Sequence, residues 1–254
     1  MDRNQNGSRS RSSANQNSSN GIVIAFSVVV LGLIGWILFG SNSSSTPNAL
    51  PSESASPSPS VSLKLVDYCG DSAIPNLEPE QFDAPEQMGL QTNQIWTLTT
   101  NCGDIEIQMF TKLAPETVNS FAFLTDVGYM DGIACHRLTT QGLFVLQCGD
   151  PTATGAGGPG YGLPEENLPE AGTNNYPAGT VAMARTSEPG SGGSQFFLVF
   201  EDTTLGPDYT IFGKVVSGLD IIRDVAEVGV FGGGGDGTPG QPIGILSAKM
   251  EPAN

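Results

Sequence analysis

Residues 95–110 read IWTLTTNCGDIEIQMF, and this stretch decides the fold class. Apolar or β-branched side chains alternate with polar ones from Ile95 to Thr100 and again from Ile105 to Phe110, a pattern typical of strands with one buried face. Asn101–Asp104 lies between the two runs and consists of turn-forming residues around Gly103. The stretch therefore predicts a β-hairpin.

The sequence on the C-terminal side of this hairpin predicts more strands than helices. A helix of about twelve residues is expected to begin at Pro115 and to end before Gly128, because proline suits the first helical turn and glycine ends a helix. A second helix is expected over Leu219–Glu227. Gly- and Pro-rich segments separate six more predicted strands: Ile133–Leu138, Phe144–Cys148, Thr180–Ala184, Phe196–Phe200, Thr210–Val216 and Ile243–Met250. The prediction is a mainly β fold, a closed eight-stranded antiparallel barrel capped by two α-helices.

The N-terminal part of the chain has the composition of a membrane anchor. Residues 21–40 are without charge and long enough, as a helix, to cross the hydrocarbon core of a bilayer. A cleaved signal peptide is the alternative, but its apolar region is usually shorter and ends in a small-residue cleavage site. Residues 1–20 are polar and contain three arginines, so we expect a disordered cytoplasmic tail and an extracytoplasmic C-terminal part. The expected location is therefore the cell membrane, with a single transmembrane helix.

Two segments separate the anchor from the domain. Residues 41–62 are rich in Ser and Pro, which predicts a semi-extended linker. Residues 63–92 are acidic and without periodicity, which indicates an extended lead-in to a domain over residues 93–254.

Composition excludes several classes of function. The chain has 10 Lys and Arg against 26 Asp and Glu, a formal net charge of −16, which argues against binding nucleic acid. A single histidine, His136, excludes His-rich metal sites, and it lacks a neighbouring nucleophile motif. We therefore interpret His136 as a structural strand residue rather than a general base, and we expect no metal and no cofactor.

Two other candidate sites have simpler explanations. The glycine-rich run at residues 155–162 contains Pro159 and is followed by no Lys-Ser/Thr pair, so a structural loop is favoured over a phosphate loop. The glycines at 232–235 have the same interpretation. Asp150, Glu165 and Glu166 could form a glycosidase acid/base pair, but acidic loops are common in so acidic a chain.

The four cysteines predict two disulfides. An even number in an exported domain favours disulfide bonds, and three connectivities are possible. Cys135 and Cys148 lie on consecutive predicted strands, which antiparallel pairing would bring together, so we predict this bond, worth about 3 kcal/mol. The remaining bond, Cys69–Cys102, would tie the lead-in to the first hairpin.

Several motifs, in the same order along the chain, resemble the cyclophilin family, and the resemblance covers about residues 94–250. With its cysteines and predicted anchor, the chain is most similar to membrane-anchored, exported bacterial cyclophilins. The motifs are Ala114–Phe121, His136–Leu138, Phe144–Pro151, Gly157–Tyr161, Gly179–Ala184, Gly193–Phe197 and Thr210–Val215.

The resemblance implies a peptidyl-prolyl cis-trans isomerase that acts on X-Pro bonds of exported proteins. It implies that Arg137 is catalytic, that Gln147 supports it and that Gln195 orients the peptide. The other residues that the resemblance assigns to substrate binding are Phe144, Val145, Ala184, Arg185, Phe197, Leu205 and Tyr209. The expected partners are Pro-containing peptides and unfolded exported proteins.

The chain departs from the family pattern around the proposed pocket. Arg185 stands where the family usually has Asn, Thr204 where many members have Trp, and Tyr209 where many have His. Two extra residues lie within Thr139–Leu143. Because that Trp contacts cyclosporin in the family, we expect weak cyclosporin binding here. The alternative function is a catalytically weak, membrane-tethered module that binds Pro-containing peptides.

Overall fold

The computed structural model describes residues 66–67, 69–71 and 80–253. The predicted tail, anchor and linker over residues 1–62 lie outside these residues. Among the described residues, no helix combines the length and the apolar character needed to cross a bilayer.

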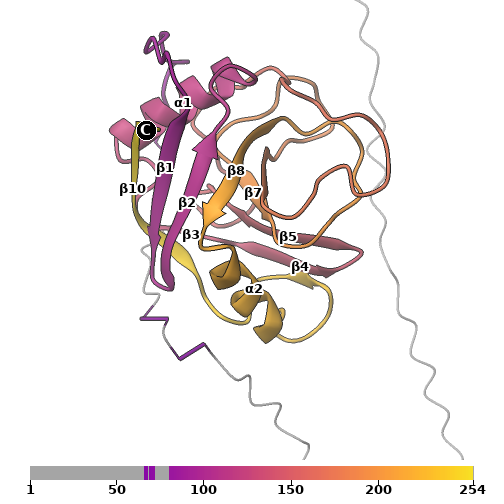
Figure 1. The fold of residues 1–254 in the computed structure, drawn as a ribbon. Coiled ribbons are helices and arrows are strands. Elements are labelled where there is room, and N and C mark those ends of the chain that lie inside the picture. The colour runs from indigo at the N-terminus through magenta and orange to yellow at the C-terminus, as the bar shows by residue number, and fades with distance from the viewer. Residues whose placement is uncertain (1–65, 68, 72–79, 254) are drawn as a thin grey trace, which may run out of the picture. The chain divides into compact units, whose positions relative to one another are not determined.

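The described residues form a mainly β fold with ten strands and two helices. The helices are α1 (Pro115–Asp126) and α2 (Leu219–Val228), and Figure 1 shows them at opposite ends of the curved sheet. The strands are β1 (Gln94–Thr100), β2 (Gly103–Met109), β3 (Ile133–Ala134), β4 (Arg137–Gln141), β5 (Leu143–Cys148), β6 (Thr180–Met183), β7 (Phe196–Val199), β8 (Ile211–Ser217), β9 (Asp236–Gly237) and β10 (Gly244–Pro252).

The predicted hairpin is confirmed as β1 and β2, which pair with Trp96 opposite Ile107. Both of these side chains are fully buried. At the turn, the Thr100 hydroxyl donates a hydrogen bond to the Gly103 carbonyl at 2.6 Å, and Gly103 has a φ of 118°. Glycine adopts such a φ at little cost, which is why the turn falls here.

The strand count differs from the eight that the sequence predicts. Eight strands have four or more residues, and the two-residue strands β3 and β9 complete one sheet in the order β3-β10-β1-β2-β8-β6-β7-β5-β4-β9. In this order β3 and β9 are the two edge strands and do not pair with each other. The hydrogen bonds therefore describe an open sheet, not the predicted closed ring of eight strands.

The single strand predicted over residues 133–138 is divided into β3 and β4. Cys135 donates its backbone N–H to Ile243 next to β10, whereas His136 donates to Gln147 on β5, both at 3.0 Å. The chain therefore changes pairing partner between these two residues, and that change of direction ends β3.

Both predicted helices are confirmed within one or two residues. The α1 helix begins at Pro115, and its first backbone N–H groups, those of Glu116 and Thr117, donate to the Glu166 carboxylate at 3.0 and 2.8 Å. A carboxylate stabilises a helix at this end because it satisfies free donors and opposes the positive end of the helix dipole. The α2 helix buries Ile222 and Val225.

Two apolar clusters occupy opposite faces of the central strands. The main core surrounds the stacked and edge-on rings of Trp96, Phe121, Phe196 and Phe212, with neighbouring centroids 4.7 to 5.7 Å apart. The second cluster contains Phe197, next to Phe196 on β7. Consecutive side chains on a strand point to opposite faces, so β7 contributes to both clusters.

Residues 80–92, named the strap here, run along the domain without helix or strand structure. Phe82 donates its backbone N–H to the Pro159 carbonyl at 2.7 Å. Met88 donates its backbone N–H to Asn119 on α1 at 2.7 Å. The acidic lead-in therefore contacts the domain at several points.

Candidate active site

Arg137 and Gln147 face each other across two paired strands. Their backbones pair in the β4–β5 ladder, and Gln147 in turn pairs with Phe197 on β7. Directly paired residues of antiparallel strands project on the same face. The three side chains therefore form one row across the sheet.

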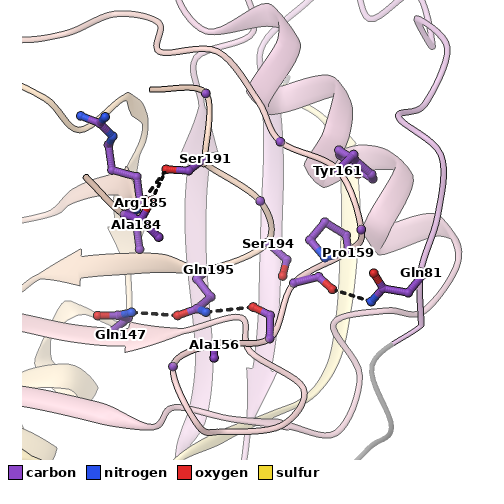
Figure 2. Close-up of a pocket in the computed structure, with 18 residues that line it drawn as sticks. Gln81, Gln147, Ala156, Pro159, Tyr161, Ala184, Arg185, Ser191, Ser194 and Gln195 are labelled. Carbon is purple, nitrogen blue, oxygen red and sulfur yellow. Dashed lines mark hydrogen bonds between the residues drawn. The ribbon is translucent and has the colours of Figure 1, made fainter. Parts of the chain in front are cut away.

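A relay of hydrogen bonds continues from this arginine. Arg137 Nη1 donates to Gln147 Oε1 at 3.4 Å, and Gln147 Nε2 donates to Gln195 Oε1 at 2.9 Å. Gln195 Nε2 donates to the Gly157 carbonyl at 2.9 Å. Figure 2 shows Gln147 and Gln195 connected in this way. The amide of Gln195 is thereby held in one orientation.

Asp236 holds the other edge of the arginine, a role that was not predicted from the sequence. Arg137 donates from Nε to Oδ1 at 2.8 Å and from Nη2 to Oδ2 at 2.7 Å, a bidentate ion pair. The hydrogen bond with Arg137 lowers the pKa of Asp236 and raises that of the guanidinium. The side chain of Arg137 remains 41% exposed, so the pair leaves it accessible.

No spacing rule pointed to Asp236, because it lies 99 residues from Arg137 in a glycine-rich loop. That loop reads FGGGGDGTPG over residues 231–240, and Asp236 is its one charged side chain. The β4–β9 ladder pairs Thr139 with Asp236, and this tertiary pairing brings the carboxylate to the arginine.

The two strands that contain Arg137 and Gln147 are also tied by a disulfide. Cys135 and Cys148 are bonded, as the sequence predicted, with Cα atoms 4.0 Å apart. The second predicted bond, Cys69–Cys102, is present as well. The first bond fixes β5 to the chain just before β4, next to Arg137 and Gln147.

Five residues that the resemblance assigned to substrate binding meet around the second apolar cluster. Val145 and Phe197 are nearly fully buried there, and partly buried Ala184, Leu205 and Tyr209 pack against them. The rings of Phe197 and Tyr209 lie edge-on with centroids 5.6 Å apart. This cluster is apolar and adjoins Gln147, so it suits a small apolar ring such as proline.

Phe144 lies elsewhere. It packs against the main core, with its ring centroid 6.0 Å from that of Phe200. Because Phe144 precedes Val145 on β5, their side chains point to opposite faces of the strand. Of these two residues only Val145 belongs to the second apolar cluster, and the assignment of Phe144 to substrate binding stays a prediction.

Arg185 connects loops on the far side of the cluster. Its Nε lies 3.2 Å from Glu165, and its Nη atoms donate to the carbonyls of Asp208 and Ser187 at 3.5 and 3.4 Å. Figure 2 shows its guanidinium directed away from Gln195. Of the three substituted positions, Thr204 is exposed and accepts a hydrogen bond from the Asn174 backbone.

A groove of about 810 Å³ adjoins the apolar cluster (Figure 2). The glycine run at residues 155–162, which we name the glycine loop, forms one wall. The opposite side is formed by Ala184 to Thr186, Gly190, Ser191 and Gly193 to Gln195, and Gln81 of the strap also lines the groove.

Asp150 stabilises the glycine loop through hydrogen bonds with the loop backbone. It is fully buried and accepts hydrogen bonds from the backbone N–H groups of Thr152, Gly155 and Gly157. Burial acts to raise the pKa of Asp150, but these hydrogen bonds outweigh it and lower the pKa below its usual value. This carboxylate is therefore an acceptor that organises a loop.

Glu165 and Glu166 have structural roles, whereas both ring nitrogens of His136 are buried without a hydrogen-bond partner in the described part of the chain. Glu165 pairs with Arg185 and accepts a hydrogen bond from Gly190, whereas Glu166 caps α1, so neither forms an acid/base pair with Asp150. Burial lowers the pKa of His136, which keeps the ring neutral at neutral pH. No group of three or more His, Cys, Asp or Glu side chains among the described residues is arranged to hold a metal ion.

The protein is thus a mainly β protein with an accessible arginine beside an apolar cluster and a groove. The chain matches the family model for the cyclophilin type peptidyl-prolyl cis-trans isomerases over residues 95–250. It belongs to the cyclophilin family.

Relatives agree with this assignment. The chain is 40% identical over 166 residues to the probable peptidyl-prolyl cis-trans isomerase B of Mycobacterium tuberculosis strain H37Rv, covering 61% of this chain and 54% of the relative. It is 39% identical to peptidyl-prolyl cis-trans isomerase B of Bacillus subtilis, covering 48% of this chain and 83% of the relative. The chain thus spans about half the length of the mycobacterial protein.

A solved structure shares the fold. A Cryptosporidium parvum cyclophilin type peptidyl-prolyl cis-trans isomerase, crystallised in the presence of the dipeptide Ala-Pro, superposes with a TM-score of 0.54 and 28% identity. The match covers 63% of this chain and 99% of that one.

Proposed function

We propose that this protein is a peptidyl-prolyl cis-trans isomerase that acts on X-Pro bonds of exported proteins. The observation that carries the proposal is the row of Arg137, Gln147 and Phe197, in which a held guanidinium adjoins an apolar cluster. Membership of the cyclophilin family supports it, as does the Ala-Pro dipeptide used with the related structure.

The chemistry requires no broken bond. Rotation about an X-Pro bond is opposed by a barrier of about 18–20 kcal/mol, because resonance gives the C–N bond double-bond character. Twisting localises a lone pair on the prolyl nitrogen, to which a guanidinium N–H donates a hydrogen bond. Such a contact is stronger in the twisted state than in the planar one, which is the condition for catalysis.

The pairing of Arg137 determines which of its N–H groups are available. Asp236 uses one edge of the guanidinium, formed by Nε and Nη2, while Nη1 lies on the side of Gln147. We therefore assign the donation to the prolyl nitrogen to Nη1. The apolar cluster of Val145, Phe197, Leu205 and Tyr209 holds the proline ring while the acyl side rotates.

The proposed location is outside the cytoplasm, at the membrane. Residues 21–40 would anchor the chain, with the N-terminus cytoplasmic and the isomerase domain extracytoplasmic. The two disulfides support this location, because such bonds persist in oxidising compartments. Proteins that fold after export would then be the clients.

We also propose weak cyclosporin binding, since Thr204 replaces a large aromatic contact and lies exposed. Calorimetric titration with cyclosporin is expected to give a Kd well above the nanomolar range. A nanomolar Kd would contradict this.

A second candidate function is a peptide-binding module with little turnover. The bidentate pair with Asp236 favours it, because the pair occupies two donors of the guanidinium and offsets its charge.

The test is isomerisation of a short X-Pro peptide by the full chain, purified oxidised in mild detergent, with Arg137→Ala as the variant. We expect the wild type to accelerate isomerisation and the variant to lose about a hundredfold in kcat/KM, the usual cost of one transition-state donor. A wild type that binds the peptide but does not accelerate isomerisation would replace the enzyme with the binding module.

A further inference from the structure

The strap touches the glycine loop although it lies outside the part of the chain that matches the cyclophilin family, residues 95–250. Gln81 Nε2 donates to the Gly158 carbonyl at 3.1 Å, and the Phe82 backbone N–H donates to the Pro159 carbonyl at 2.7 Å. Figure 2 shows Gln81 reaching the loop beside Pro159. Two consecutive residues of the strap thus bond two consecutive residues of the loop.

The loop is shaped to receive the strap at Gly160. This residue has a φ of 98°, and a Cβ atom there would lie 2.8 Å from Gln81 Oε1 and 3.2 Å from the Phe82 backbone N and O. A side chain at this position would require the Gln81 side chain to move and the Phe82 backbone to shift by a few tenths of an ångström, at a φ that favours glycine. The contact is therefore a close fit of two backbones.

Phe82 anchors the strap on the opposite side. Its ring lies edge-on to those of Phe123 and Tyr129, with centroids 5.4 and 6.0 Å apart. The hydroxyl of Tyr129 is 3.2 Å from that of Ser194, which lines the groove. Edge-on aromatic pairs are favourable beyond the area they bury, so Phe82 fixes the strap in position.

The strap is connected to the arginine through the loop. Gly157, next to the carbonyl that Gln81 binds, accepts the hydrogen bond of Gln195 that ends the relay from Arg137. The side chain of Gln81 also lines the groove itself. The strap therefore contributes both a wall of the groove and a support for the loop that positions Gln195.

We infer that the strap is a specificity-determining part of the peptide site, in which Gln81 contacts residues of a bound peptide that extend away from the proline. The groove there presents the amide of Gln81, the hydroxyls of Thr186 and Ser191, and loop backbone, while the charge of Arg185 is offset by Glu165. Such a lining suits an extended peptide with uncharged, hydrogen-bonding side chains such as Ser, Thr, Asn or Gln. This inference rests on the proposed function.

The test compares Gln81→Ala with Gln87→Ala in the full chain. Gln87 is a matched control, because it is a strap glutamine that bonds Glu116 and does not line the groove. Two substrates are used, a four-residue X-Pro peptide and an eight-residue peptide with Ser and Gln flanking the proline. A net hydrogen bond is worth about 0.5–1.5 kcal/mol, so Gln81→Ala should lower the long-to-short ratio of kcat/KM about two- to tenfold, mainly through KM.

The long-to-short ratio of kcat/KM for Gln87→Ala should equal that of the wild type. An unchanged ratio in Gln81→Ala, or the same fall in both variants, would overturn the inference while leaving the isomerase in place.

An inactive wild type would instead overturn the proposed function, and peptide binding then tests the strap separately. Amide NMR signals of Gly158 and Gly160 should shift when the eight-residue peptide is added to the wild type, and less so in Gln81→Ala. Binding without any shift at these two glycines would overturn the inference.

Discussion

Two arginines flank the apolar cluster, and each is paired with a carboxylate in a different setting. Arg137 extends from β4, bonds Asp236 on β9 and keeps 41% of its side chain exposed. Arg185 lies in a loop, contacts Glu165 and two backbone carbonyls, and keeps only 14% exposed. The first cation is held by the sheet and remains open to a ligand, whereas the second connects loops to one another.

An ion pair therefore has different effects on two sides of one site. On the strand side, Asp236 fixes an orientation, because the strands already fix the positions of both backbones. On the loop side, Arg185 supplies part of the order of the segments around Ser187 and Asp208. The first pair should therefore affect rate most, and the second stability.

The largest effect should follow from replacing each arginine by lysine. An ammonium cannot donate to Asp236 and Gln147 in the geometry of a guanidinium, so Arg137→Lys should lower kcat/KM about tenfold to a hundredfold. Arg185→Lys should lower it by no more than about threefold. Isomerisation kinetics on one short peptide measure both, and equal losses in the two variants would break the comparison.

Removal of the carboxylate should have the next largest effect. Asp236→Ala frees the guanidinium to rotate, and we expect kcat to fall about five- to tenfold because catalysis depends on orientation. The same change in an Arg137→Lys background should cost much less, since residues that act through one group are not additive. A full additional loss in that background would show that Asp236 acts on the fold instead.

Loss of the loop-side cation should mainly reduce stability. Arg185→Ala removes a mostly buried side chain and leaves Glu165 without its partner, which should lower the free energy of unfolding by about 1 kcal/mol. Denaturant unfolding under oxidising conditions measures this. A variant as stable as the wild type would contradict the role assigned to these contacts.

The smallest effect concerns His136, which adjoins Arg137. Burial and Arg137 lower the pKa of His136, while Asp150 and Gln195 oppose this shift. As the pH falls, the unfolded chain therefore binds this proton before the folded protein does. The stability that the neutral histidine contributes is fully present above its ordinary pKa of about 6.5, and it is lost as the pH falls from there toward the folded-state pKa. Between pH 7.5 and 5.5, the free energy of unfolding should fall less for His136→Gln than for the wild type. An equal loss would assign the acid sensitivity to other groups.

Much of the fold was predictable because local patterns agree with the final structure. The hairpin follows from alternation, the start of α1 from Pro115, and the Cys135–Cys148 bond from two cysteines on consecutive predicted strands, which left Cys69–Cys102 as the second bond. The break at Cys135–His136 was not predictable, since no local signal marks a strand that changes its pairing partner. The packing of Phe144 against the main core, on the other face of β5 from Val145, was also not predicted, because the family motif was carried over without regard to strand alternation.

Most of the secondary structure, both disulfides and the candidates Arg137, Gln147 and Gln195 could be predicted from the sequence, because they depend on local periodicity, on the positions of the cysteines or on ordered motifs. The contact of Asp236 with the arginine and that of the strap with the glycine loop at Gly160 follow from the tertiary structure alone. Both contacts join segments 77 to 99 residues apart, and it is the packing of the whole sheet that brings them together.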